Sequence, residues 1–139
     1  MSLVDTLTVT IGSAGSTITF ERGPQPGDAV ELLGVTVRDE DLCAGRQVYE
    51  GYEFGFVSLS RYFAGLADAW RGWSGERTYE SLEGDLCIVA THNGRVHLEV
   101  RLAQSTVIDG WRVQAHLTID AGEELSQAAR DLADLVTGV

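Results

Sequence analysis

The chain contains no lysine, and all ten of its basic residues are arginines. The absence of lysine excludes catalysis through a lysine Schiff base and excludes a lysine-containing phosphate loop. The sequence also lacks a glycine-rich phosphate loop and the Gly-x-Ser-x-Gly turn that presents a nucleophilic serine. We therefore expect no cofactor, and the sequence favours a protein that is not an enzyme.

Cysteine and proline are scarce, with two residues of each. Cys43 and Cys87 do not make a disulfide framework, so we expect buried thiols in a reducing compartment. Both prolines fall in residues 23–27, which predicts a loop. No apolar run is long enough to cross a bilayer and no signal-peptide pattern begins the chain, so we expect a cytoplasmic protein without a membrane partner.

The charge is strongly one-sided, with 21 acidic residues, a net charge of −11 and a pI near 4.5. This balance disfavours nucleic acid and anionic membranes as partners, because both require a basic surface. A length of 139 residues with 44% hydrophobic content is sufficient for one core. We expect a single domain over residues 1–139.

Alternating apolar residues predict seven strands. They cover residues 6–11, 16–22, 30–37, 42–50, 85–92, 95–103 and 111–119. Apolar residues at steps of three and four predict a helix over 58–72, with Ser58 as its N-cap or Ser60 as a competing choice. A second amphipathic helix begins after Asp120, and Glu123 lies three residues on, as in a capping box.

The predicted order is β-β-β-β-α-β-β-β-α. Hairpin connections imply an antiparallel sheet, and two amphipathic helices need an apolar surface to cover. The fold class expected is α+β, a two-layer domain with one antiparallel sheet of about seven strands and two helices.

The Asn93-Gly94 dipeptide predicts a two-residue hairpin turn between the strands 85–92 and 95–103. A two-residue loop would place Leu86 and Ile88 on the same face as His97 and Glu99. Because a solvent face does not normally hold those two apolar residues, we expect a homodimer or partner surface there.

Residues 70–84 carry a resemblance to a known family. Trp70-Arg71-Gly72-Trp73-Ser74-Gly75-Glu76-Arg77, followed by Tyr79-Glu80-Ser81-Leu82-Glu83-Gly84, is similar to the pattern of a family of small actinobacterial proteins of unknown function. The likeness covers about residues 56–136, with Tyr79 at a position where the family has tryptophan. It implies a single-domain, cytoplasmic bacterial protein and implies no activity.

Several side chains are candidates for chemistry. The residues His97, His116 and Glu99 fall near one another in neighbouring predicted strands, and two histidines with a carboxylate are possible ligands of a divalent metal. Their spacing matches no metal motif, so surface histidines are the favoured interpretation and we expect no metal.

Two non-enzymatic functions follow from the remaining features. The acidic segment Asp39, Glu40 and Asp41 predicts a surface for a basic protein partner, as in immunity-type proteins that neutralise basic toxins. The alternative is a small-molecule-binding domain whose pocket, between sheet and helices, is lined by Trp70, Trp73, Tyr79 and Trp111.

Overall fold

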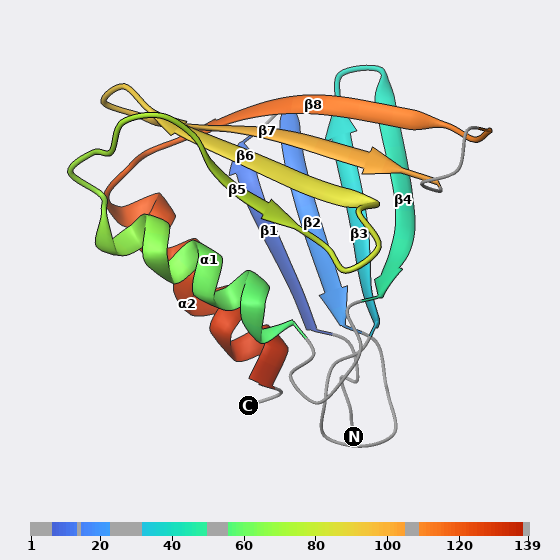
Figure 1. Ribbon diagram of the computed structural model, residues 1–139, viewed down its shortest axis with the longest axis horizontal. Coiled ribbons are helices and arrows are strands. Elements are labelled where there is room, and N and C mark those ends of the chain that lie inside the picture. Colours follow the sequence, from blue (N-terminus) through green and yellow to red (C-terminus); the bar gives the residue numbers. More distant parts are fainter. Residues whose placement is uncertain (1–6, 14, 23–31, 50–55, 105–108, 138–139) are drawn as a thin grey trace.

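The computed structural model describes residues 7–13, 15–22, 32–49, 56–104 and 109–137 (Figure 1). The proline loop predicted at residues 23–27 lies outside these ranges.

The first sheet is an antiparallel meander of four strands in the order β1-β2-β3-β4. Its strands are β1 (Leu7–Ser13), β2 (Ser16–Arg22), β3 (Leu32–Asp39) and β4 (Leu42–Tyr49). Alternate residues face the core, as the sequence pattern predicts. The buried side chains of this sheet are Val9, Ile11, Ile18, Phe20, Leu33, Val35, Val37 and Val48.

The second sheet is another antiparallel meander, in the order β5-β6-β7-β8. Its strands are β5 (Arg77–Glu80), β6 (Leu86–His92), β7 (Val96–Ala103) and β8 (Arg112–Ile119). The short strand β5 is not among the seven predicted strands, because four residues with one apolar side chain are too few for a period to show.

The α+β class is confirmed, whereas the prediction of one sheet of about seven strands is wrong. In the described residues β4 and β5 do not pair, and β8 instead contacts β1, β2 and β3 of the first sheet (Figure 1). Alternation in the sequence shows that each strand buries one face. It does not show whether two strands separated by a helix belong to one sheet.

The helices are α1 (Val57–Asp68) and α2 (Glu123–Thr137), which lie side by side, with α2 also in contact with β1 (Figure 1). Their apolar faces join the same core as the two sheets, through Leu59, Phe63, Leu66, Leu125, Leu132 and Leu135. The core therefore has contributions from both sheets and both helices.

The first helix begins and ends differently from the prediction. Phe56, not Ser58, occupies the N-cap position and makes no side-chain capping bond. Its side chain is fully buried and its carbonyl accepts from the backbone N–H of Leu59 and Ser60, so burial of an aromatic ring sets the start of the helix. The helix ends at Asp68, four residues before the predicted end.

The start of the second helix agrees with the sequence. Asp120 Oδ2 accepts from the backbone N–H groups of Gly122 and Glu123, at 3.1 and 3.0 Å. The reciprocal bond is made by Glu124, whose carboxylate accepts from the Asp120 N–H at 2.7 Å, and not by Glu123.

The hairpin at Asn93-Gly94 forms, but its loop is one residue longer than predicted. His92 pairs with Val96, so residues 93–95 make the turn. His92 Nδ1 accepts from the Gly94 N–H at 3.1 Å, and its Nε2 lies 2.8 Å from the Trp70 carbonyl oxygen. These contacts hold the longer turn. The longer turn changes the register of β6 against β7 by one residue, and a change of one residue moves every side chain of a strand to the other face.

Two glycines provide a test of the backbone geometry. Gly12 has φ +111°, and a Cβ there would lie 2.4 Å from the Ser16 carbonyl oxygen, whereas a Cβ on Gly65 in α1 would meet no atom within 4 Å. We expect Gly12→Ala to destabilise the protein by more than about 1 kcal/mol and Gly65→Ala to stabilise it by about 0.5–1 kcal/mol. Urea unfolding of the two variants measures both effects, and equal effects of the two substitutions would contradict the assignment.

Candidate functional site

A buried carboxylate lies at the end of the second sheet, just before β6. Asp85 is 2% exposed, and its Oδ1 accepts a 2.6 Å hydrogen bond from the Ser81 hydroxyl. That hydroxyl in turn accepts from the Leu86 N–H at 3.0 Å. The turn between β5 and β6 is therefore folded around the Asp85 side chain.

Arg46 on β4 connects this carboxylate to the first sheet. Its Nη2 lies 3.0 Å from Asp85 Oδ2, and its Nη1 donates to the carbonyl oxygens of Ala103, at 2.9 Å, and Gln104. The Ala103 N–H also donates to the Asp85 carbonyl at 2.9 Å. One guanidinium thus holds the ends of β6 and β7 against β4.

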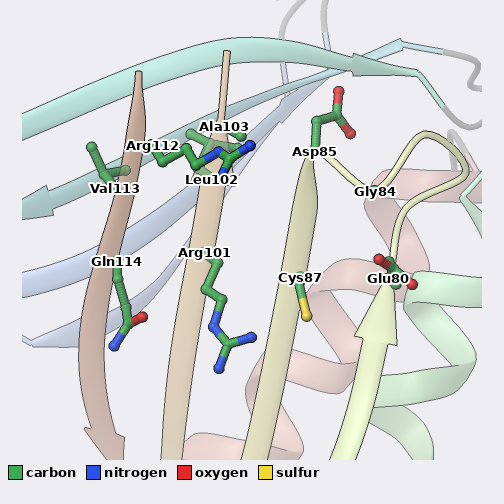
Figure 2. A pocket seen from close by; sticks show the side chains of 10 residues that line it. All are labelled: Glu80, Gly84, Asp85, Cys87, Arg101, Leu102, Ala103, Arg112, Val113 and Gln114. Carbon is green, nitrogen blue, oxygen red and sulfur yellow. The ribbon is translucent and has the colours of Figure 1, made fainter. Parts of the chain in front are cut away.

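A hollow of about 570 Å³ lies beside this ion pair. Its lining residues come from all four strands of the second sheet and from the β5–β6 turn (Figure 2): Glu80, Gly84, Asp85, Cys87, Arg101, Leu102, Ala103, Arg112, Val113 and Gln114. Four of them stand opposite one another in the strand register, because Glu80 pairs with Cys87, Cys87 with Arg101, and Arg101 with Gln114. They form one row across the outer face of the sheet.

Charges of both signs are separated in this hollow. Arg101 forms an ion pair with Glu99. Among the described residues, neither Arg112 nor Glu80 has an ion pair or a side-chain hydrogen bond. Figure 2 shows the Arg112 side chain near Ala103, its partner in the strand register, while Glu80 lies on the other side of Cys87. The hollow therefore has a basic side on β7 and β8 and an acidic side on β5.

Cys87 lies between these two sides and remains protonated. Burial raises the pKa of its thiol, and the nearby Glu80 and Glu99 carboxylates raise it further, whereas Arg101 acts in the opposite direction. The thiol is accordingly a neutral group at neutral pH. The prediction of buried thiols is wrong for Cys43, which is exposed, and Cys87 is half-buried.

A family model for a family of unknown function, DUF6228, matches residues 9–139 of this sequence. The chain belongs to the DUF6228 family. The match includes the first sheet as well as the part that follows α1. No curated protein and no solved structure matches the chain. The actinobacterial origin and the motif over residues 70–84 stay predictions.

The acidic segment predicted to bind a partner lies on a turn of the DUF6228 chain. Asp39 ends β3, Leu42 begins β4, and Glu40 and Asp41 form the exposed turn between them. The Asp39 side chain accepts from the Glu40 N–H at 2.8 Å. No ion pair among the described residues includes any of the three carboxylates. In Figure 1 this turn projects past β8.

The four aromatic residues predicted to line a pocket do not come together. The Trp73 indole donates to the carbonyl of Ala90 at 3.4 Å, near the end of β6. The Trp111 carbonyl accepts a hydrogen bond from the Gln104 backbone N–H at the opposite end of the sheet. At the rise of a strand, this end is about 20 Å from Ala90. Tyr79 is buried in the core, whereas Trp70 is 48% exposed.

The predicted oligomer face depended on the wrong hairpin register. Leu86 pairs with Leu102 and Ile88 with Val100, and all four side chains are buried in the core. His97 and Glu99 lie on the opposite, outer face of the sheet. Because the chain itself covers Leu86 and Ile88, the reason to expect a homodimer at this face is removed.

The histidines are close but do not form a metal site. Glu99 stands opposite His116, and the rings of His97 and His116 are 6.2 Å apart. His97 Nε2 lies 2.8 Å from Asn93 Oδ1. Within the part of the chain that the structure describes, no three histidine, cysteine or acidic side chains form a group that could hold a metal ion.

None of the described helices has the length and apolar character needed to cross a membrane.

The sequence did not bring Arg46, Asp85, Glu80 and Arg112 together in one site. Asp85 and Arg46 are 39 positions apart, so no local pattern joins them. The alternation of β7 and β8 places Arg101, Arg112 and Gln114 on the outer face. Only the correct alignment of the four strands shows that they surround one hollow.

The ion pair between Arg46 and Asp85 predicts a strong coupling in stability. Arg46→Met alone should destabilise the protein by about 3 kcal/mol, because it leaves a buried charge without a partner. In the double variant Arg46→Met/Asp85→Asn, the neutral amide still accepts from Ser81, so we expect a coupling free energy of about 1–3 kcal/mol. Urea unfolding of the two single variants and the double variant measures this coupling. Additive losses would show that the two side chains do not interact.

Proposed function

We propose that this DUF6228 protein is a non-enzymatic interaction module, and that its partner is a protein that docks on the outer face of β5–β8. The partner site is centred on the hollow between Glu80 and Arg112. The sequence favours an immunity-like role, in which the protein covers a basic partner.

The open, charged hollow is the observation that carries the proposal. Small-molecule pockets are mostly apolar and enclose most of their ligand. This hollow lies on an outer sheet face instead, and its rim side chains Glu80, Arg101, Arg112 and Gln114 are all exposed. Protein interfaces combine polar contacts of this kind with an enrichment in arginine. The dimensions of the hollow and its separated charges suit a protruding segment of a partner that carries charges of both signs.

The net charge of −11 and the acidic turn add a long-range electrostatic attraction for a basic partner. Asp39, Glu40 and Asp41 have no cationic partner among the described residues, so their field extends into solvent. Fields of this kind accelerate association with a partner of opposite charge and weaken as salt increases. The partner we propose is therefore basic overall, while its contacts in the hollow are of both signs.

A second candidate is the binding of a small molecule in the same hollow. A volume of about 570 Å³ is within the range of ligand pockets. This candidate replaces the aromatic pocket, because Trp111 lies at the opposite end of the sheet from Trp73.

A charge swap tests the docking site without changing the net charge. We expect Glu80→Arg/Arg112→Glu to reduce the affinity for the captured partner at least about tenfold, because each contact in the hollow then meets a like charge. The control Arg61→Glu/Glu76→Arg makes the same swap at exposed positions outside the hollow and should bind as the wild type does. Capture from a lysate of the source organism identifies the partner, and titration calorimetry compares the variants. Equal affinity of the hollow swap and the wild type would refute the proposed site.

The acidic turn should act on the rate of association. Glu40→Lys/Asp41→Lys is expected to slow association several-fold at low salt, with little change in dissociation, because exposed charges act mainly on encounter. Asp68→Lys/Glu76→Lys changes the net charge by the same amount elsewhere and should slow association less. Surface plasmon resonance at low and high salt separates the two rates, and an equal effect of both variants would show that only net charge matters.

A further inference from the structure

Two arginines stand at diagonal positions of neighbouring strands in the hollow. Ala103 pairs with Arg112 and Arg101 pairs with Gln114, so Arg101 and Arg112 are two residues apart across the β7–β8 ladder. Diagonal neighbours are about 7–8 Å apart at their backbones, which is within reach of long side chains. Two like charges at this spacing repel each other, and an anion bound beside them would offset the repulsion that Glu99 leaves uncompensated.

The protein supplies a counter-ion for only one of these two arginines. Arg101 forms an ion pair with Glu99, which uses part of a guanidinium that carries five N–H donors. Arg112 has no such partner among the described residues, although acidic residues outnumber basic ones by 21 to 10 in this chain. Its side chain lies near Ala103 and lines the hollow (Figure 2).

The other lining groups restrict the charge of the ligand. The Cys87 thiol between the two sides is neutral. Glu80 places on the same hollow a carboxylate that has no ion pair among the described residues, whereas the Asp85 carboxylate is paired with Arg46. A dianion such as phosphate is repelled by Glu80 more strongly than a monoanion is. A planar carboxylate also matches the fork of a guanidinium.

We propose that the hollow is a carboxylate-binding site, in which Arg112 holds the carboxylate, Arg101 adds to the positive potential of the same side, and Glu80 accepts a hydrogen bond from a donor group of the same ligand. Since β5 and β7 are two strand spacings apart, this donor lies about 10 Å from the carboxylate. This inference rests on the proposed function, because it takes the carboxylate from an acidic side chain or the chain terminus of the partner protein. A free carboxylic acid offers the same chemistry.

Titration of the intact protein with sodium acetate tests the site directly. At pH 7 and constant ionic strength, we expect saturable amide shifts at residues 101–103 and 112–114, and weaker binding of phosphate than of acetate. Arg112→Gln should reduce the acetate affinity at least about tenfold, in line with one charged hydrogen-bonded contact. Arg95→Gln removes an exposed arginine at the β6–β7 turn of the same sheet and should leave the acetate affinity unchanged.

A second measurement uses the thiol in the hollow. In a Cys43→Ser background, saturating acetate should slow the alkylation of Cys87 by iodoacetamide, and Arg112→Gln should abolish this protection. Shifts that are linear in acetate, or that chloride reproduces, would overturn the carboxylate site. An unchanged acetate affinity in Arg112→Gln would also overturn it.

The source of the carboxylate is decided by comparing acetate with the captured partner. Acetate binding together with loss of partner capture in the Glu80→Arg/Arg112→Glu swap supports a carboxylate of the partner. Acetate binding with unchanged capture supports a free carboxylic acid as ligand and refutes the proposed docking function. Loss of capture without acetate binding leaves the docking function in place and refutes the carboxylate site.

Discussion

The carboxylate of Asp85 forms an ion pair with Arg46, and this pair links the two sheets of the protein. A carboxylate that is 2% exposed is costly to keep charged unless it is compensated, and it is compensated by the Ser81 hydroxyl and by one guanidinium. The same guanidinium binds the carbonyl oxygens of Ala103 and Gln104. Asp85 and Ala103 also line the hollow, so the shape of the candidate site depends on this inter-sheet contact.

Much of the local structure could be predicted from the sequence. Of the elements in the described part of the chain, seven of the eight strands, both helices and the Asp120 cap follow from periodicity and capping chemistry, which act between neighbouring residues. Phe56 shows where that reasoning ends, because a buried ring and not a capping serine sets the start of α1. The division into two sheets is set by contacts of β8 with β1, β2 and β3, which are distant in the sequence.

The candidate site was less accessible to prediction, and a single residue explains much of the difference. His92 holds a three-residue turn where Asn93-Gly94 predicts two residues, and the register of β6 against β7 shifts by one. With the predicted register, Leu86 and Ile88 face outward and suggest an oligomer face. With the observed register they are buried, and Cys87 joins Arg101 on the outer face instead. The exposed position of the acidic turn could be predicted, because it depends only on a local hairpin.

The proposed function has two parts. The acidic protein attracts a basic partner at long range, and the partner docks in a hollow where one sheet holds charges of both signs in place. Hydrogen exchange of the protein with and without its captured partner tests this account most directly. The account predicts that backbone protection on binding concentrates at residues 80–87, 101–104 and 111–114. Protection confined to the outer face of β1–β4 or to the helices, with these segments unchanged, would contradict it.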